Sequence, residues 1–202
     1  MRYRILLLSL YCFIVSSDTV AQKSPYPRLT IEKEPAGKFE FNKNWAYRWD
    51  VVKDRNGKFS SAEVEKVTAK DTTHLYFTAD CKTNVQGGYK IRYCYATKKP
   101  GSVVLSFTDG APAYASEYKV IVKEDHFTFD PVIVYPELIL GQKLTYNITR
   151  AKLILYQKDY SAAKMISGYV DAEFTETIID KGVSKTNKLY FRGYFKTQVK
   201  AN

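Results

Sequence analysis

Apolar and polar residues alternate with a period of two along most of the chain, the pattern of strands that have one buried and one exposed face. The clearest segments cover residues 75–81, 170–175 and 189–196. Similar segments are residues 29–32, 38–41, 47–52, 103–107, 118–122, 132–135, 144–148 and 152–156. Tyr, Phe and β-branched residues are common in these segments, as expected for a pleated, half-covered surface.

Glycine and proline turns separate the predicted strands, for example Asn56-Gly57, Pro100-Gly101 and Lys181-Gly182. Helix signals are confined to residues 60–67 and 161–165, so we expect at most one or two short helical turns. Many short strands with few helices predict an all-β fold. We favour an antiparallel β-sandwich, because the uneven strand spacing is less typical of the alternative, a closed β-barrel.

Two cysteines flank a symmetric segment that predicts a disulfide-bridged hairpin. Gly87-Gly88 suits a two-residue turn, since glycine adopts positive φ at little cost. If Gln86 faces Tyr89 across that turn, Cys81 faces Cys94 at a separation that a disulfide accepts. We therefore predict a structural Cys81–Cys94 bridge.

The first residues have the character of a signal peptide. Basic Arg2 and Arg4 precede an apolar segment, residues 5–15, and the small residues around Ala21 suit cleavage after it. The apolar segment is too short to cross a bilayer core of about 30 Å. We predict a cleaved leader at residues 1–21, a single β-rich domain at residues 22–202 without a transmembrane segment, and a secreted or periplasmic location.

The chain carries a net charge of +10, mostly from lysines spread along its length. Such a surface favours anionic partners such as acidic glycans or anionic surfaces. We predict no nucleic-acid partner, because no recognition motif is present. We also predict no cofactor and no metal. The nearest metal motif is segment 54–63, which resembles the later part of a calcium-binding loop. The first ligand position of such a loop falls on Val52, which has no carboxylate. The segment is better explained as a hairpin turn at Asn56-Gly57.

Candidate binding residues lie on the polar side of two late strands. The chain contains 17 Tyr and 11 Phe, and Tyr190 and Tyr194 alternate with basic residues on one predicted strand face. Exposed Tyr and Arg together are typical of recognition surfaces. The candidate set is Tyr190, Arg192, Tyr194, Lys196, Asp171 and Glu173.

Catalytic signals are weaker than binding signals. Asp171 and Glu173 share a strand face and could form an acid-base pair, but Arg192 and Lys196 could equally be their cross-strand partners. His74 and His126 are the only histidines, and no nucleophile elbow accompanies them. We predict no catalytic residues, although the sequence leaves open whether the protein is an enzyme.

Three functions follow in order of preference. The first is an exported, non-enzymatic binding protein that uses its aromatic and basic strand face to hold a glycan, a surface polymer or a protein partner. The second is a calyx-like carrier of a small apolar ligand. The third is a carboxylate-dependent hydrolase.

Overall fold

The computed structural model describes residues 27–110, 116–135 and 143–201. It is 59% strand and 4% helix, so the predicted all-β class is confirmed. The predicted leader at residues 1–21 lies outside the described residues. In the part of the chain that is described, no helix has the length and apolarity needed to span a membrane.

The described residues form fourteen strands and two short 3-10 helices. In chain order they are β1 (Thr30–Ile31), η1 (Glu40–Lys43), β2 (Trp45–Ala46), β3 (Val51–Lys53), β4 (Phe59–Ser61), β5 (Leu75–Tyr76), β6 (Ala79–Thr83), η2 (Val85–Gly87), β7 (Tyr89–Ile91), β8 (Tyr93–Lys99), β9 (Ser102–Thr108), β10 (Glu117–Lys123), β11 (His126–Val132), β12 (Lys143–Leu155), β13 (Met165–Asp180) and β14 (Val183–Lys200).

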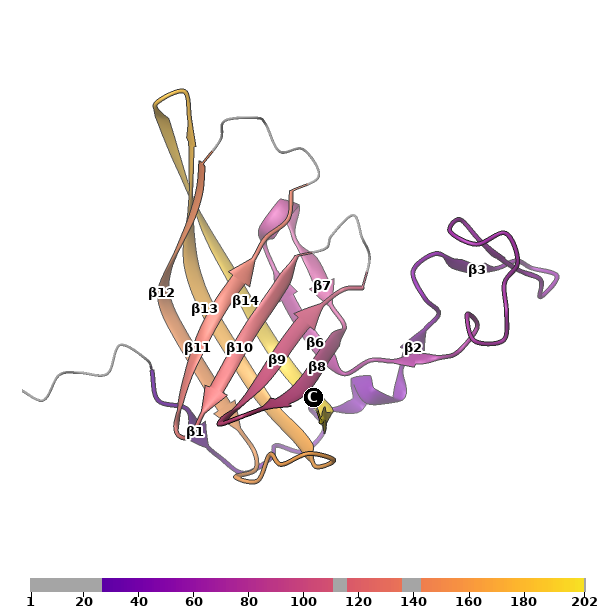
Figure 1. Ribbon diagram of the computed structural model, residues 1–202, viewed down its shortest axis with the longest axis horizontal. Helices are drawn as coiled ribbons and strands as arrows, with labels where there is room; N and C mark the ends of the chain where they lie inside the picture. Colours follow the sequence, from indigo (N-terminus) through magenta and orange to yellow (C-terminus); the bar gives the residue numbers. More distant parts are fainter. Residues whose placement is uncertain (1–26, 111–115, 136–142, 202) are drawn as a thin grey trace, which may run out of the picture.

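Ten of these strands form one curled sheet in the order β1-β12-β13-β14-β8-β9-β10-β11, with β6 paired to β14 and β7 to β6. The long strand β14 joins the two halves, because it pairs with β13 along most of its length, with β6 over Phe191–Phe195 and with β8 at Val199–Lys200. In Figure 1 strands β8 to β11 lie in front of β13 and β14, and β12 runs beside β11 at the left edge, so the halves face each other. The curl is compatible with a sandwich or a barrel-like description.

The sheet is mixed, whereas the sequence predicted a wholly antiparallel one. β1 pairs with β12 in parallel, and β14 pairs with β8 in parallel. Both parallel pairs join strands that are far apart in the sequence, where no hairpin imposes an antiparallel direction.

Aromatic side chains fill the space between the two halves of the sheet. Tyr118 stacks on Phe191 with their ring centroids 4.4 Å apart, and Phe107 and Phe129 contact Phe191 from neighbouring positions. Phe174 packs against Tyr118 from β13. These side chains are buried, so the apolar residues of the alternating pattern face inward and form the core.

The cysteine hairpin has a different register from the one predicted. Cys81 faces Ile91 and Thr83 faces Tyr89, because the turn is widened by η2 and does not consist of Gly87-Gly88 alone. Cys94 lies beyond the hairpin on β8, where its backbone exchanges hydrogen bonds with the Thr78 hydroxyl. The predicted opposition of the two cysteines is therefore wrong, and both are buried free thiols in the structure.

Residues 45–76 form an arm that projects from the sheet and carries the small pairs β2–β5 and β3–β4 (Figure 1). The predicted turn at Asn56-Gly57 is confirmed, since β3 and β4 pair across it. The Asp54 carboxylate accepts backbone N–H bonds from Asn56 and Lys58 within that turn, as expected of a turn rather than a calcium loop.

Five local predictions are wrong. The strand expected over residues 47–52 is one of them, because residues 49–50 form a turn and only Val51 and Val52 belong to β3. Residues 60–67 start in strand β4 and form no helix, and residues 161–165 form only a turn before β13. Residues 38–41 run into the 3-10 helix η1, and β11 ends at Val132 where a strand over 132–135 was expected. These segments are short, and tertiary contacts readily override local propensity in short segments.

Candidate functional site

The candidate residues lie on the outer face, defined here as the side of β12, β13, β14, β6 and β7 that points away from the core. Phe191 and Phe195 on β14 are buried, so the alternating Tyr190, Arg192 and Tyr194 point to the other side. The same rule applies to β13, where buried Ala172 separates Asp171 from Glu173. The structure therefore brings the two predicted strand faces together, as direct neighbours in register.

Two arginines and two carboxylates form an ion-pair network at the centre of the outer face. One Arg150 nitrogen lies 2.9 Å from Asp171 Oδ2 and 2.8 Å from Glu173 Oε1. Arg192 reaches the same two carboxylates at 3.4 and 3.5 Å. The hydrogen bond from Arg150 lowers the pKa of Glu173, and the hydrogen bond to Glu173 raises the pKa of Arg150. The acids are thus charge-neutralised, and the predicted cross-strand role of Arg192 is confirmed.

Tyr190 and Arg192 form one wall of a pocket of about 530 Å³. The guanidinium carbon of Arg192 lies 4.5 Å from the centroid of the Tyr190 ring, in cation-π geometry. Glu173, Thr149 and Lys188 line the same pocket. Thr149 stands at a register shift in the β12–β13 pairing, which locally interrupts the sheet beside the pocket.

Lys196 does not join this group. It pairs with Glu34 at 2.9 Å instead of with Asp171 or Glu173, and its ammonium lies over the Phe39 ring. Although burial alone would raise the pKa of Glu34, hydrogen bonds from Lys196 and Ser167 lower it. The segment that holds Glu34 and Phe39 therefore occupies this end of the outer face. That long-range contact was not predictable from the sequence pattern.

Tyr194 belongs to an aromatic part of the outer face next to the pocket. Its ring lies 4.9 Å from that of Tyr169, directly across on β13. Phe39 contacts the Tyr194 ring edge-on. Tyr194 thus lies on the outer face between the pocket and the end that the segment with Glu34 and Phe39 occupies. It does not line the pocket itself.

A row of charged residues crosses the outer face through Arg192 and is here called the basic row. Cross-strand pairing runs from Lys152 to Asp171, Arg192, Lys82 and Lys90. The three lysines are exposed, and Asp171 is the only acid among the five. Four further cations of this face were not among the predicted site residues: Lys82, Lys90, Lys152 and Arg150. Alternation with buried Cys81 could have placed Lys82 outside, but nothing in the sequence pairs β6 with β14.

The two histidines lie outside this site. His74 stacks on Trp45 in the arm, with ring centroids 3.5 Å apart. His126 is on β11, where its Nδ1 contacts the Asp125 carboxylate. Within the described ranges, no group of three or more His, Cys, Asp or Glu side chains is arranged to hold a metal ion.

The class of protein defined by this geometry is an all-β protein with a basic and aromatic outer face. Comparison with known proteins finds no matching family model, no similar curated protein and no similar solved structure.

Proposed function

We propose that this chain is an exported, non-enzymatic binding protein that holds an acidic glycan on its outer face. The observation that carries the proposal is the basic row, which contains four cations and a single acid, Asp171. The row runs beside a pocket that has an aromatic wall. Partly exposed cations aligned on a rigid sheet attract carboxylate or sulfate groups.

The neighbouring aromatic rings favour a sugar-bearing polymer over a simple anion. Tyr190 offers a flat ring to the pocket. The Tyr169–Tyr194 pair lies further along the same face, on the other side of the Asp171–Arg192 pair. Rings of this kind give contact area at a low entropy cost. A chain of acidic sugars would place its ring faces on the tyrosines and its anionic groups on the basic row.

The two alternative functions find less support. An apolar carrier needs internal space, but aromatic side chains fill the interior between the sheet halves. A hydrolase needs a carboxyl group with a raised pKa to act as general acid. The pKa of Glu173 is lowered by Arg150, which is the opposite shift.

Binding of acidic and neutral oligosaccharides of equal length tests the proposal. The chain is titrated with an oligogalacturonate and with a neutral galacto-oligosaccharide at two salt concentrations. We expect the acidic sugar to bind, and its affinity to fall as salt rises, because exposed charges are screened beyond about 8 Å at physiological ionic strength. Equal binding of the neutral sugar, or affinity that does not change with salt, would contradict the proposal.

A further inference from the structure

A carboxylate occupies an inward position at one end of the curled sheet. On β13 the inward residues Val170, Ala172 and Phe174 are buried and apolar, and the next inward residue is Glu176. Only 1% of Glu176 is exposed. A buried charge at an apolar position costs free energy unless other groups stabilise it. Such a departure from the pattern is typical of functional sites.

Neutral donors hold the Glu176 carboxylate. The Tyr135 and Tyr146 hydroxyls donate to Oε1, and the Asn187 amide donates to Oε2 from 3.0 Å. Across the described ranges, no Lys, Arg or His side chain forms an ion pair with Glu176. A carboxylate accepts about four hydrogen bonds, so Oε2 can accept one more.

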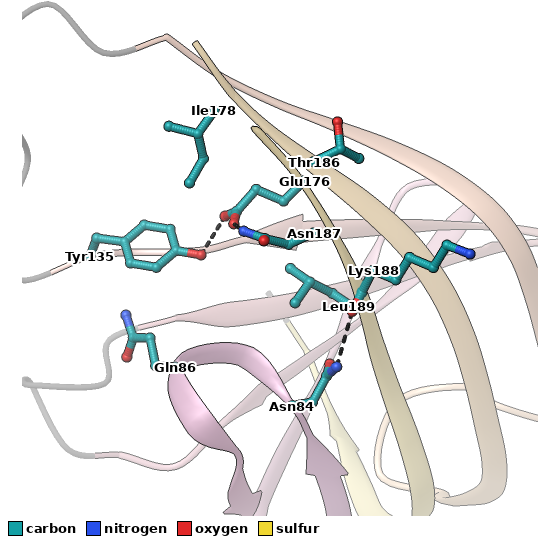
Figure 2. A pocket seen from close by; sticks show the side chains of 9 residues that line it. All are labelled: Asn84, Gln86, Tyr135, Glu176, Ile178, Thr186, Asn187, Lys188 and Leu189. Atoms are coloured by element: carbon teal, nitrogen blue, oxygen red, sulfur yellow. Dashed lines mark hydrogen bonds between the residues drawn. The ribbon is translucent and has the colours of Figure 1, made fainter. Parts of the chain in front are cut away.

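Glu176 faces a pocket of about 540 Å³. Figure 2 shows the Tyr135 hydroxyl and the Asn187 amide pointing toward the Glu176 carboxylate, whereas the ammonium end of Lys188 points away from it. Ile178 and Leu189 supply apolar walls. The pocket thus combines one negative charge with an aromatic ring and aliphatic surface.

We propose that this pocket binds a small organic cation whose ammonium group pairs with Glu176. A desolvated carboxylate that lacks a basic partner gains most from a ligand that brings a positive charge. The faces of tyrosine rings also attract cations. This site adjoins the glycan site, since Asn84, Lys188 and Leu189 line both pockets. Glu176 lines only this pocket, whereas Glu173, Tyr190 and Arg192 line only the other.

Calorimetric titration of the full chain with choline tests the inference. The matched probe is 3,3-dimethyl-1-butanol, in which a neutral carbon replaces the quaternary nitrogen. We expect choline to bind with one-to-one stoichiometry and the neutral alcohol not to bind at the same concentration. Equal binding of the two probes, or no binding of choline, would overturn the inference.

Variants separate this site from the outer face. Glu176→Gln keeps the size and an acceptor oxygen but removes the charge, so we expect at least a tenfold loss of choline affinity. Glu173→Gln, on the outer face, should leave choline binding unchanged. If Glu176→Gln does not fold, Ile178→Trp fills the pocket from its half-exposed wall and should abolish choline binding. Choline affinity retained in a folded Glu176→Gln or Ile178→Trp variant would overturn the inference.

Discussion

Arg192 holds its guanidinium carbon 4.5 Å from the centre of the Tyr190 ring while its nitrogens reach Asp171 and Glu173. One side chain therefore links the aromatic wall of the pocket to the ion-pair network. Both acids also pair with Arg150, so the ion-pair network holds Arg192 in place. The exposed lysines of the basic row take no part in these ion pairs. The outer face can thus be rigid and still present positive charge.

Gly193→Ala should destabilise the protein strongly. A Cβ at this position would lie 2.2 Å from the Asp80 carbonyl oxygen and 2.4 Å from the Cys81 Cα, so β6 would have to move off β14. We expect a loss of about 3 kcal/mol in the free energy of unfolding, measured by urea titration.

Gly101→Ala is the matched control for Gly193→Ala. Gly101 has a φ of +70° but nothing within 4 Å of an added Cβ, so only backbone strain opposes the substitution. We expect a cost of about 1 kcal/mol. Equal costs at the two positions would contradict the close approach of β6 to β14.

The arm should lose stability in acid. Asp50 is buried beneath Arg48 and Ser61, and the hydrogen bond from Arg48 lowers its pKa below the ordinary value of 3.8. A lowered pKa stabilises the fold above the ordinary value, and that contribution is lost as the pH falls toward the folded pKa. Both tryptophans of the chain, Trp45 and Trp49, lie in the arm. We therefore expect tryptophan fluorescence to change only below about pH 4.

Arg48→Gln should move this fluorescence transition to higher pH, because Asp50 then lacks its basic partner. Arg55→Gln, an exposed change in the turn between β3 and β4, is the control and should leave it in place. A fluorescence signal that stays constant to pH 2, or one that is the same in Arg48→Gln, would argue against this role of Asp50.

The two cysteines of the fold should be unreactive until the protein unfolds. Burial raises the pKa of both the Cys81 and Cys94 thiols well above the ordinary 9.0. We expect iodoacetamide at pH 8 to label neither in the native protein and both in urea without a reductant, as read by peptide mass analysis. Labelling in urea only after reduction would instead show a disulfide.

Period-two alternation was sufficient to predict the fold class and most strand positions. It placed Tyr190, Arg192, Asp171 and Glu173 on one side of their strands, because inward positions such as Phe191 and Ala172 must be buried. Residues 144–148 and 152–156, which were predicted as two strands, belong to the single strand β12, and β14 pairs with β8 in parallel. Neither feature was predictable, since alternation within a strand carries no information about its neighbours.

Partners across long sequence separations account for the missed parts of the site. Lys82 belongs to the basic row only because β6 pairs with β14, more than 100 residues later. The turn symmetry around Gly87-Gly88 gave the wrong register, because the chain forms η2 with Gln86 at a positive φ. Glu176 could have been noticed, since it continues the inward set of Val170, Ala172 and Phe174.

The most direct measurement is the affinity of oligogalacturonate for the double variant Lys82→Gln/Lys90→Gln, compared with Lys66→Gln/Lys70→Gln. Both variants remove two exposed lysines and the same net charge, but the second pair lies on the arm. We expect about a tenfold loss of affinity for the first variant, since each exposed charge contact contributes up to about 1 kcal/mol, and almost none for the second. Equal losses in the two variants would mean that the sugar responds to net charge alone, and would contradict a binding site on the outer face.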